Sequence, residues 1–133
     1  MNAADTGLLV VDVQERFMDV IRHRDRLVWN ISRLLRGAAV LGVSAAATEQ
    51  YPEKLGPTVA ELAVHLDSPP AKFEFSCGAC GEIFARWQGE GRHRVLLCGI
   101  ETHVCVAQTA IDLMAAGFRV YLAVDALSSR FAE

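Results

Sequence analysis

The sequence has no basic block and no long apolar run, and each absence argues against a class of function. Its 133 residues include 13 Lys and Arg against 16 Asp and Glu, a net charge of −3, so binding to nucleic acid or to an anionic membrane has little electrostatic support. No apolar run approaches the ~20 residues of a membrane-spanning helix. The first residues lack the basic and apolar regions of a secretory signal. We therefore expect a cytoplasmic protein that binds neither nucleic acid nor membrane.

Motifs of several common enzyme classes are also missing. The chain has no G-x-x-x-x-G-K-[ST] for a P-loop, no G-x-G-x-x-G after its first apolar run for a dinucleotide, and no G-x-S-x-G for a serine hydrolase. Its four histidines form no i, i+4 pair. Cys77 and Cys80 form a lone C-x-x-C without the second pair that a structural zinc requires. We therefore expect no cofactor and no metal.

The chain has four cysteines. Because no secretory signal is evident and the chain is of this size, we expect free thiols rather than a disulfide framework. Cys98 lies inside an apolar run and is expected to be a small core residue. Cys77 and Cys80 are most simply two incidental thiols. A redox role for either of them, or for Cys105, stays open as an alternative.

What the sequence does contain is an alternation of apolar runs with amphipathic helical patterns, in a chain that is 52% hydrophobic and 22% charged. Its length suits a single domain, 1–133. Strands are expected at 7–13, 43–48, 71–75, 94–99 and 119–126, helices at 25–42, 58–66, 80–89 and 102–117, and a loop at 53–57. This order predicts an α/β fold: a three-layer α/β/α, Rossmann-like open sheet of about five strands, mostly parallel.

Three chemically useful side chains lie where these strands end. Asp12 follows the first strand, Lys72 lies in the short third one, and Cys105 opens the helix after the fourth. The carboxyl ends of parallel strands meet at one edge of the sheet. A helix N-terminus favours a thiolate, Asp12 can accept the thiol proton, and Lys72 can orient that carboxylate. We hypothesise a cysteine nucleophile, and the candidates for its pocket wall are Gln14, Phe17, Gln50 and Tyr51.

Three sequence blocks, in this order, resemble the isochorismatase-like cysteine hydrolase family. They are LVVDVQ at 9–14, KFEFS at 72–76 and GIETHVCV at 99–106. The third block is the most specific, and the resemblance covers nearly the whole chain. The run TEQYP at 48–52 is most similar to the subgroup named for its isochorismatase domain.

The resemblance implies an Asp-Lys-Cys triad at Asp12, Lys72 and Cys105. It also implies a cis, non-proline peptide bond at Ile100–Glu101. The oxyanion hole would then be formed by the backbone N–H groups of Glu101 and Cys105, or of their close neighbours. The expected reaction is hydrolysis of a small amide or related carbonyl compound through a covalent cysteine thioester, without a cofactor.

Departures from the family pattern bear on the substrate and on the sheet. Nicotinamidases of this superfamily carry metal-binding histidines after the second strand, and residues 48–52 contain none. Enzymes that act on isochorismate lack the nucleophilic cysteine. The family sheet has six strands, so the resemblance implies a domain shortened at its C-terminal end. An open edge at 119–124 favours a homo-oligomer, and it leaves a second alternative, a non-catalytic α/β assembly module.

Overall fold

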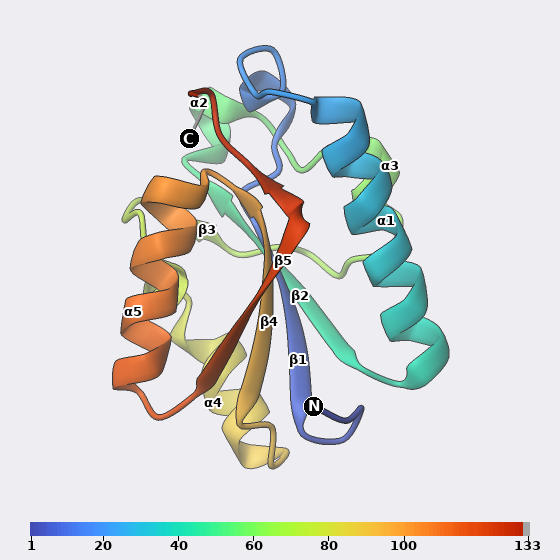
Figure 1. Ribbon diagram of the computed structural model, residues 1–133. Helices are drawn as coiled ribbons and strands as arrows, with labels where there is room; N and C mark the ends of the chain where they lie inside the picture. The colour runs from blue at the N-terminus through green and yellow to red at the C-terminus, as the bar shows by residue number, and fades with distance from the viewer. Residues whose placement is uncertain (132–133) are drawn as a thin grey trace.

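The computed structural model describes residues 1–131 and contains a five-stranded parallel sheet with helices on both faces (Figure 1). The strand order is β3-β2-β1-β4-β5, and every neighbouring pair runs parallel. The strands are β1 (Thr6–Val11), β2 (Ser44–Gln50), β3 (Ala71–Lys72), β4 (Arg94–Ile100) and β5 (Arg119–Ser128). This confirms the α/β fold expected from the sequence.

The helices form two layers around this sheet. They are α1 (Arg24–Leu41), α2 (Pro52–Leu55), α3 (Ala60–Ala63), α4 (Gly81–Gly89) and α5 (Ala107–Ala115), with short 3-10 turns at Glu15–Phe17 and Cys77–Ala79. Helices α1 and α3 cover one face, and α4 and α5 cover the other (Figure 1).

Four local expectations differ from the structure. The expected loop at 53–57 overlaps the helical turn α2, because Pro52 suits the first position of a helix. The expected helix at 102–117 begins with a π-helical turn, Thr102–Val106, before α5. The expected helix at 58–66 is limited to Ala60–Ala63, and the expected strand at 71–75 is limited to Ala71–Lys72.

The longest helix, α1, follows its amphipathic pattern closely. Leu27, Ile31, Leu35 and Ala38 recur at helical spacing and are buried against the sheet. The helix ends at Gly42, which adopts a left-handed φ of 71° and donates its N–H to the Ala38 carbonyl.

The central strand β1 contributes side chains to both cores. Leu8 and Val10 pack in the cluster beneath α1, while Leu9 and Val11 pack in the cluster beneath α4 and α5. All six of its residues are buried, as expected for a strand covered on both faces. The residue that follows, Asp12, is therefore delivered by the most deeply buried part of the fold.

Gly99 allows β1 and β4 to approach each other next to this point. It pairs with Val11 in the sheet register and has a φ of 114°. A Cβ atom at this position would overlap the backbone N and O atoms of Val11. No larger residue fits here without moving one of the two central strands.

Gly99→Ala is therefore expected to lower the free energy of unfolding by about 3 kcal/mol, measured by urea denaturation. Gly37→Ala is the matched control, because a Cβ on Gly37 in α1 would meet no atom outside its helix within 4 Å. The control is expected to raise the free energy of unfolding by about 0.5–1 kcal/mol. Equal effects of the two substitutions would contradict this packing argument.

Candidate active site

Asp12 is fully buried and both of its carboxylate oxygens are bound. Its Oδ2 atom accepts a hydrogen bond from Lys72 Nζ at 2.8 Å, and its Oδ1 atom accepts one from Thr48 Oγ1 at 2.8 Å. Asp12 itself is 0% exposed and adopts a left-handed φ of 52° at the end of β1. Thr48 reaches it because β2 lies beside β1, with Val11 and Thr48 in register.

Lys72 is the cation of this pair, and it is 2% exposed. Besides Asp12, its Nζ atom contacts Gln50 Oε1 at 2.7 Å and the backbone carbonyls of Phe75 at 2.8 Å and Glu74 at 3.1 Å. The ammonium group is thus surrounded by acceptors, as a buried charge requires. The structure confirms that Asp12 and Lys72, 60 residues apart in the chain, meet at one site.

Gln14 and Gln50 hold this arrangement in place. Gln14 Oε1 accepts the backbone N–H of Gln50 at 2.7 Å, while its Nε2 donates to the carbonyls of Gln50 and Gly56 at 2.9 and 2.8 Å. The Gln50 side chain contacts Lys72 through Oε1 and donates from Nε2 to the carbonyl of Phe73 at 3.0 Å. The Gln50 amide therefore contacts the ion pair through Lys72, and the Gln14 amide holds the Gln50 backbone in place.

The other two residues expected at the pocket wall are aromatic, and their rings contact other groups. Phe17 is half-buried and packs against the core beneath α1. Tyr51 stacks edge-on against Phe73, with ring centroids 4.9 Å apart, and its ring lies beneath the Lys54 ammonium. The ring contacts of these two residues are thus with Phe73, Lys54 and Arg130 rather than with Asp12 or Lys72.

Cys105 lies in the π-helical turn, 4% exposed, beside the Asp12 carboxylate. Burial raises the pKa of its thiol to about 12, and the charge and hydrogen bonding of Asp12 add to this, while Lys72 opposes it. The expectation that a helix terminus would favour a thiolate is therefore wrong. Burial of the sulfur is the largest cause of the raised pKa, and it favours the thiol form of Cys105 next to the carboxylate.

The sequence interpretation missed the roles of Thr48 and Cys77. Thr48 Oγ1 lies 3.3 Å from Cys77 Sγ, and the Cys77 backbone N–H donates to Thr109 Oγ1 at 2.8 Å. Burial raises the pKa of the Cys77 thiol to about 12 as well. The position of Thr48 at the end of β2 was a usable signal, because it places the hydroxyl next to Asp12.

The turn that carries Cys105 is tightly organised. The peptide bond Ile100–Glu101 is cis, as the family resemblance implied. The Glu101 carbonyl accepts hydrogen bonds from the N–H groups of Val104 at 3.1 Å and Val106 at 3.2 Å. Burial acts to raise the pKa of the Glu101 carboxyl, but the hydrogen bonds and charge of Arg130 hold it below its usual value.

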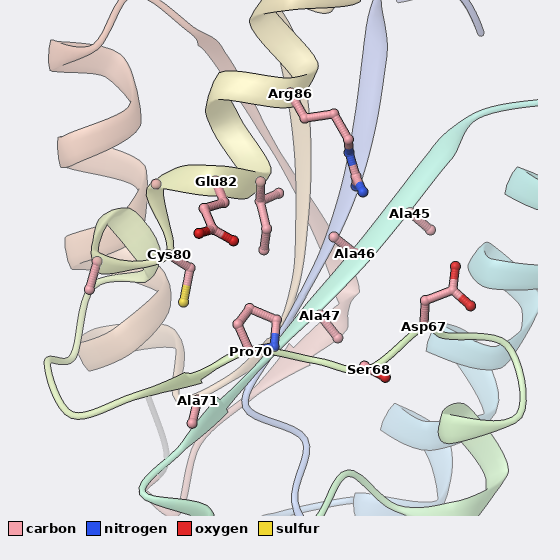
Figure 2. A pocket seen from close by; sticks show the side chains of 13 residues that line it. Ala45, Ala46, Ala47, Asp67, Ser68, Pro70, Ala71, Cys80, Glu82 and Arg86 are labelled. Atoms are coloured by element: carbon pink, nitrogen blue, oxygen red, sulfur yellow. The ribbon is translucent and has the colours of Figure 1, made fainter.

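Two clefts of the structure are lined by neither Asp12 nor Lys72. One of about 600 Å³ follows β2 over Ala45–Ala47, between α4 and the loop at 67–71 (Figure 2). Cys80, Glu82 and Arg86 line its wall on the α4 side. A second, also of about 600 Å³, runs between α1 and α3.

Within residues 1–131, no three His, Cys, Asp or Glu side chains are grouped so as to hold a metal ion. No helix in the part of the chain that the structure describes is long and apolar enough to cross a membrane.

Comparison with known proteins places this geometry in a family. The model of the isochorismatase domain matches residues 6–133, nearly the whole chain. The chain belongs to the isochorismatase family. Isochorismatase domain-containing protein 2 of Bos taurus is 42% identical over 125 residues, which is 92% of this chain and 59% of that protein. The chain spans about half the length of the curated relatives it matches. The matched share of each relative ranges from 45% to 62%.

Solved structures of the family have the same fold. The structure of the MAR1 ribonuclease from Caenorhabditis elegans superposes with a TM-score of 0.88 at 37% identity, covering 98% of this chain and 68% of that one. The Escherichia coli YcaC product, described as an octameric hydrolase of unknown specificity, has a TM-score of 0.88 at 24% identity, covering 98% of this chain and 67% of that one. At that identity the second likeness concerns the fold alone.

Proposed function

We propose that this isochorismatase-family chain is a cysteine hydrolase that acts on small amides or related carbonyl compounds through a thioester on Cys105. The observation that carries the proposal is the Asp12 carboxylate, held by Lys72 at 2.8 Å and adjacent to the buried Cys105 thiol. A nucleophile, a proton acceptor and a fixed cation thus lie within one buried cluster.

In the first half of the reaction, Asp12 accepts the thiol proton while Cys105 Sγ bonds to the substrate carbonyl carbon. Because the pKa of the thiol is about 12, a free thiolate is rare at neutral pH, so proton transfer accompanies the attack. The carbonyl electron pair moves to oxygen, where the N–H groups of Glu101 and Cys105 would stabilise it. The oxyanion then collapses, the carbon–nitrogen bond breaks, and Asp12 returns the proton to the leaving amine.

In the second half, water attacks the thioester. Asp12 accepts a proton from that water, the tetrahedral intermediate collapses, and the carbon–sulfur bond breaks to release a carboxylic acid. The proton on Asp12 restores the Cys105 thiol. Lys72 orients Asp12 through its 2.8 Å contact with Oδ2. No cofactor takes part in this proposed cycle.

The electrostatics favour this reaction over a thiol redox sensor. Redox-active cysteines combine exposure with a lowered pKa. Cys77 and Cys105 are buried, and the pKa of each is raised to about 12. Burial raises the pKa of the Cys80 thiol too.

We also propose that the chain forms a homo-oligomer. The YcaC product with the same fold is described as octameric. In this chain Leu122 and Val124 are exposed on the edge strand β5, and such an edge favours pairing with another chain. A purely structural assembly module would show the same association without any reaction at Cys105.

The proposed chemistry is tested by trapping the acyl-enzyme with p-nitrophenyl acetate, a simple activated carbonyl compound. Intact and peptide mass spectrometry is expected to find one acetyl group on Cys105 in the parent protein and in Cys80→Ala, and none in Cys105→Ala. Acetylation that persists at the same rate in Cys105→Ala would contradict the proposal. An RNA oligonucleotide is assayed in parallel, since the Caenorhabditis elegans relative is described as a ribonuclease; cleavage that requires Cys105 would favour that activity instead.

A further inference from the structure

The turn that carries Cys105 is held from outside by the end of the edge strand β5. Arg130, two residues after that strand, binds the Glu101 carboxylate in a bidentate manner. Its Nη2 atom donates to Oε1 at 2.8 Å, and its Nε lies 3.1 Å from both carboxylate oxygens. Its backbone N–H donates to Oε2 at 3.1 Å. The Glu101 side chain is 7% exposed and that of Arg130 is 43% exposed.

Ser129 and Ser128 bind the next two residues of the same turn. The Thr102 N–H donates to Ser129 Oγ at 3.1 Å, and the Thr102 hydroxyl donates to the Ser128 carbonyl at 3.1 Å. The His103 Nδ1 atom lies 3.1 Å from the same Ser129 oxygen. We call residues 128–130, with these contacts, the clamp.

The clamp contacts the turn at its backbone and at side chains next to the proposed oxyanion hole. It joins the peptide that follows the cis bond to a strand 27 residues further along the chain. A fork of two parallel N–H···O contacts fixes direction as well as distance, which a single charge contact does not. The Arg130 guanidinium also lies over the Phe17 ring, 6.0 Å from its centroid.

We propose that Arg130 and Ser129 are positioning residues for the reaction proposed above: by binding the Glu101 carboxylate and the Thr102 N–H, they hold the turn so that the Glu101 N–H faces the developing oxyanion. This inference depends on the proposed hydrolase function. In this proposal neither residue contacts the reacting atoms. Their effect would appear only when a carbonyl oxygen acquires negative charge, because a misplaced donor weakens that interaction and no other.

Two reactions of Cys105 separate this role from a general effect on folding. Acetylation by p-nitrophenyl acetate passes through an oxyanion, whereas alkylation by iodoacetamide displaces iodide and forms none. In Arg130→Gln, the limiting rate of acetylation is expected to fall about 10-fold with KM and the alkylation rate each changed by less than about two-fold. Arg130→Lys keeps the charge but loses the fork, so it is expected to recover only part of the rate.

Ser129→Ala is the second variant, and it is expected to show the same selective loss. Arg86→Gln is the matched control. The Arg86 side chain is exposed on α4, away from the clamp, and pairs with Glu90 at 4.0 Å. Both rates are expected to stay at the parent level in this control.

Each outcome decides the question. A selective loss of acetylation in Arg130→Gln and Ser129→Ala supports the clamp. Equal loss of acetylation and alkylation, or no loss in either reaction, overturns it. If the parent protein shows no acetylation that depends on Cys105, the hydrolase proposal itself fails; if it does and the clamp variants match the parent, only this inference fails.

Discussion

Asp12→Asn is expected to reduce hydrolysis by about 10²- to 10⁴-fold, the range in which a positioned proton acceptor contributes, while making Cys105 easier to alkylate. The two effects have opposite signs because Asp12 acts in two ways. In the proposed reaction it accepts the thiol proton, and its negative charge raises the pKa of the thiol. Asparagine keeps the shape of the side chain but can neither accept the proton nor repel a thiolate.

The sign of the alkylation change follows from the causes of the raised pKa. Burial is the largest cause and remains in the variant, but the contribution of the Asp12 charge is lost, and Lys72 continues to favour the thiolate. The pKa of Cys105 therefore falls from about 12. At any pH below this value the variant contains more thiolate than the parent protein.

Iodoacetamide alkylation of the Cys105 peptide, followed by mass spectrometry from neutral to alkaline pH, measures this shift. Asp125→Asn is the control, because Asp125 is exposed on β5, and its profile is expected to match the parent. An Asp12→Asn profile moved toward higher pH would contradict the charge relation between these two residues. Retention of full hydrolytic activity would exclude Asp12 as the proton acceptor.

Lys72→Met is expected to lower the free energy of unfolding by about 3–5 kcal/mol, because it leaves a buried carboxylate without its counter-ion. Asp12 would retain only the Thr48 hydroxyl and the Cys105 thiol as side-chain donors. Gln50 Oε1 and the carbonyls of Glu74 and Phe75 would also lose their donor. Unpaired buried acceptors add to the cost.

Urea denaturation of a double-mutant cycle separates the charge effect from lost packing. Asp12→Asn combined with Lys72→Met removes both charges, and it is expected to be more stable than Lys72→Met alone. Lys54→Met removes an exposed lysine above the Tyr51 ring and is expected to change stability by less than about 0.5 kcal/mol. A loss below about 1 kcal/mol for Lys72→Met would show that the ion pair is dispensable for folding.

The meeting of Asp12, Lys72 and Cys105 was predictable from the sequence because it follows from topology. Parallel strands end on the same side of a sheet, and all three residues lie at or just beyond such ends. The boundaries of α1 were predictable for a local reason, the apolar spacing closed by Gly42.

The ionisation state of the nucleophile was not predictable in the same way. The local signal, a cysteine at the start of a helix, indicates a lowered pKa, whereas the structure raises it. The difference arises from the packing around the sulfur, which involves segments far apart in the chain. The bracing role of Gln14 is similar, because its partners Gln50 and Gly56 lie 36 and 42 residues away.

The four acceptors around Lys72 also bear on how readily strand β3 separates from the sheet. Strand β3 has two residues, and an edge of that length would ordinarily fray in local fluctuations of low free energy. Here one of those two residues is Lys72, whose ammonium is bound to Asp12 on the central strand side of the sheet. Releasing the edge requires extracting a charge from the core, so amide exchange near Lys72 should follow global unfolding. We therefore expect strand β3 and the Asp12–Lys72 pair to open together rather than separately.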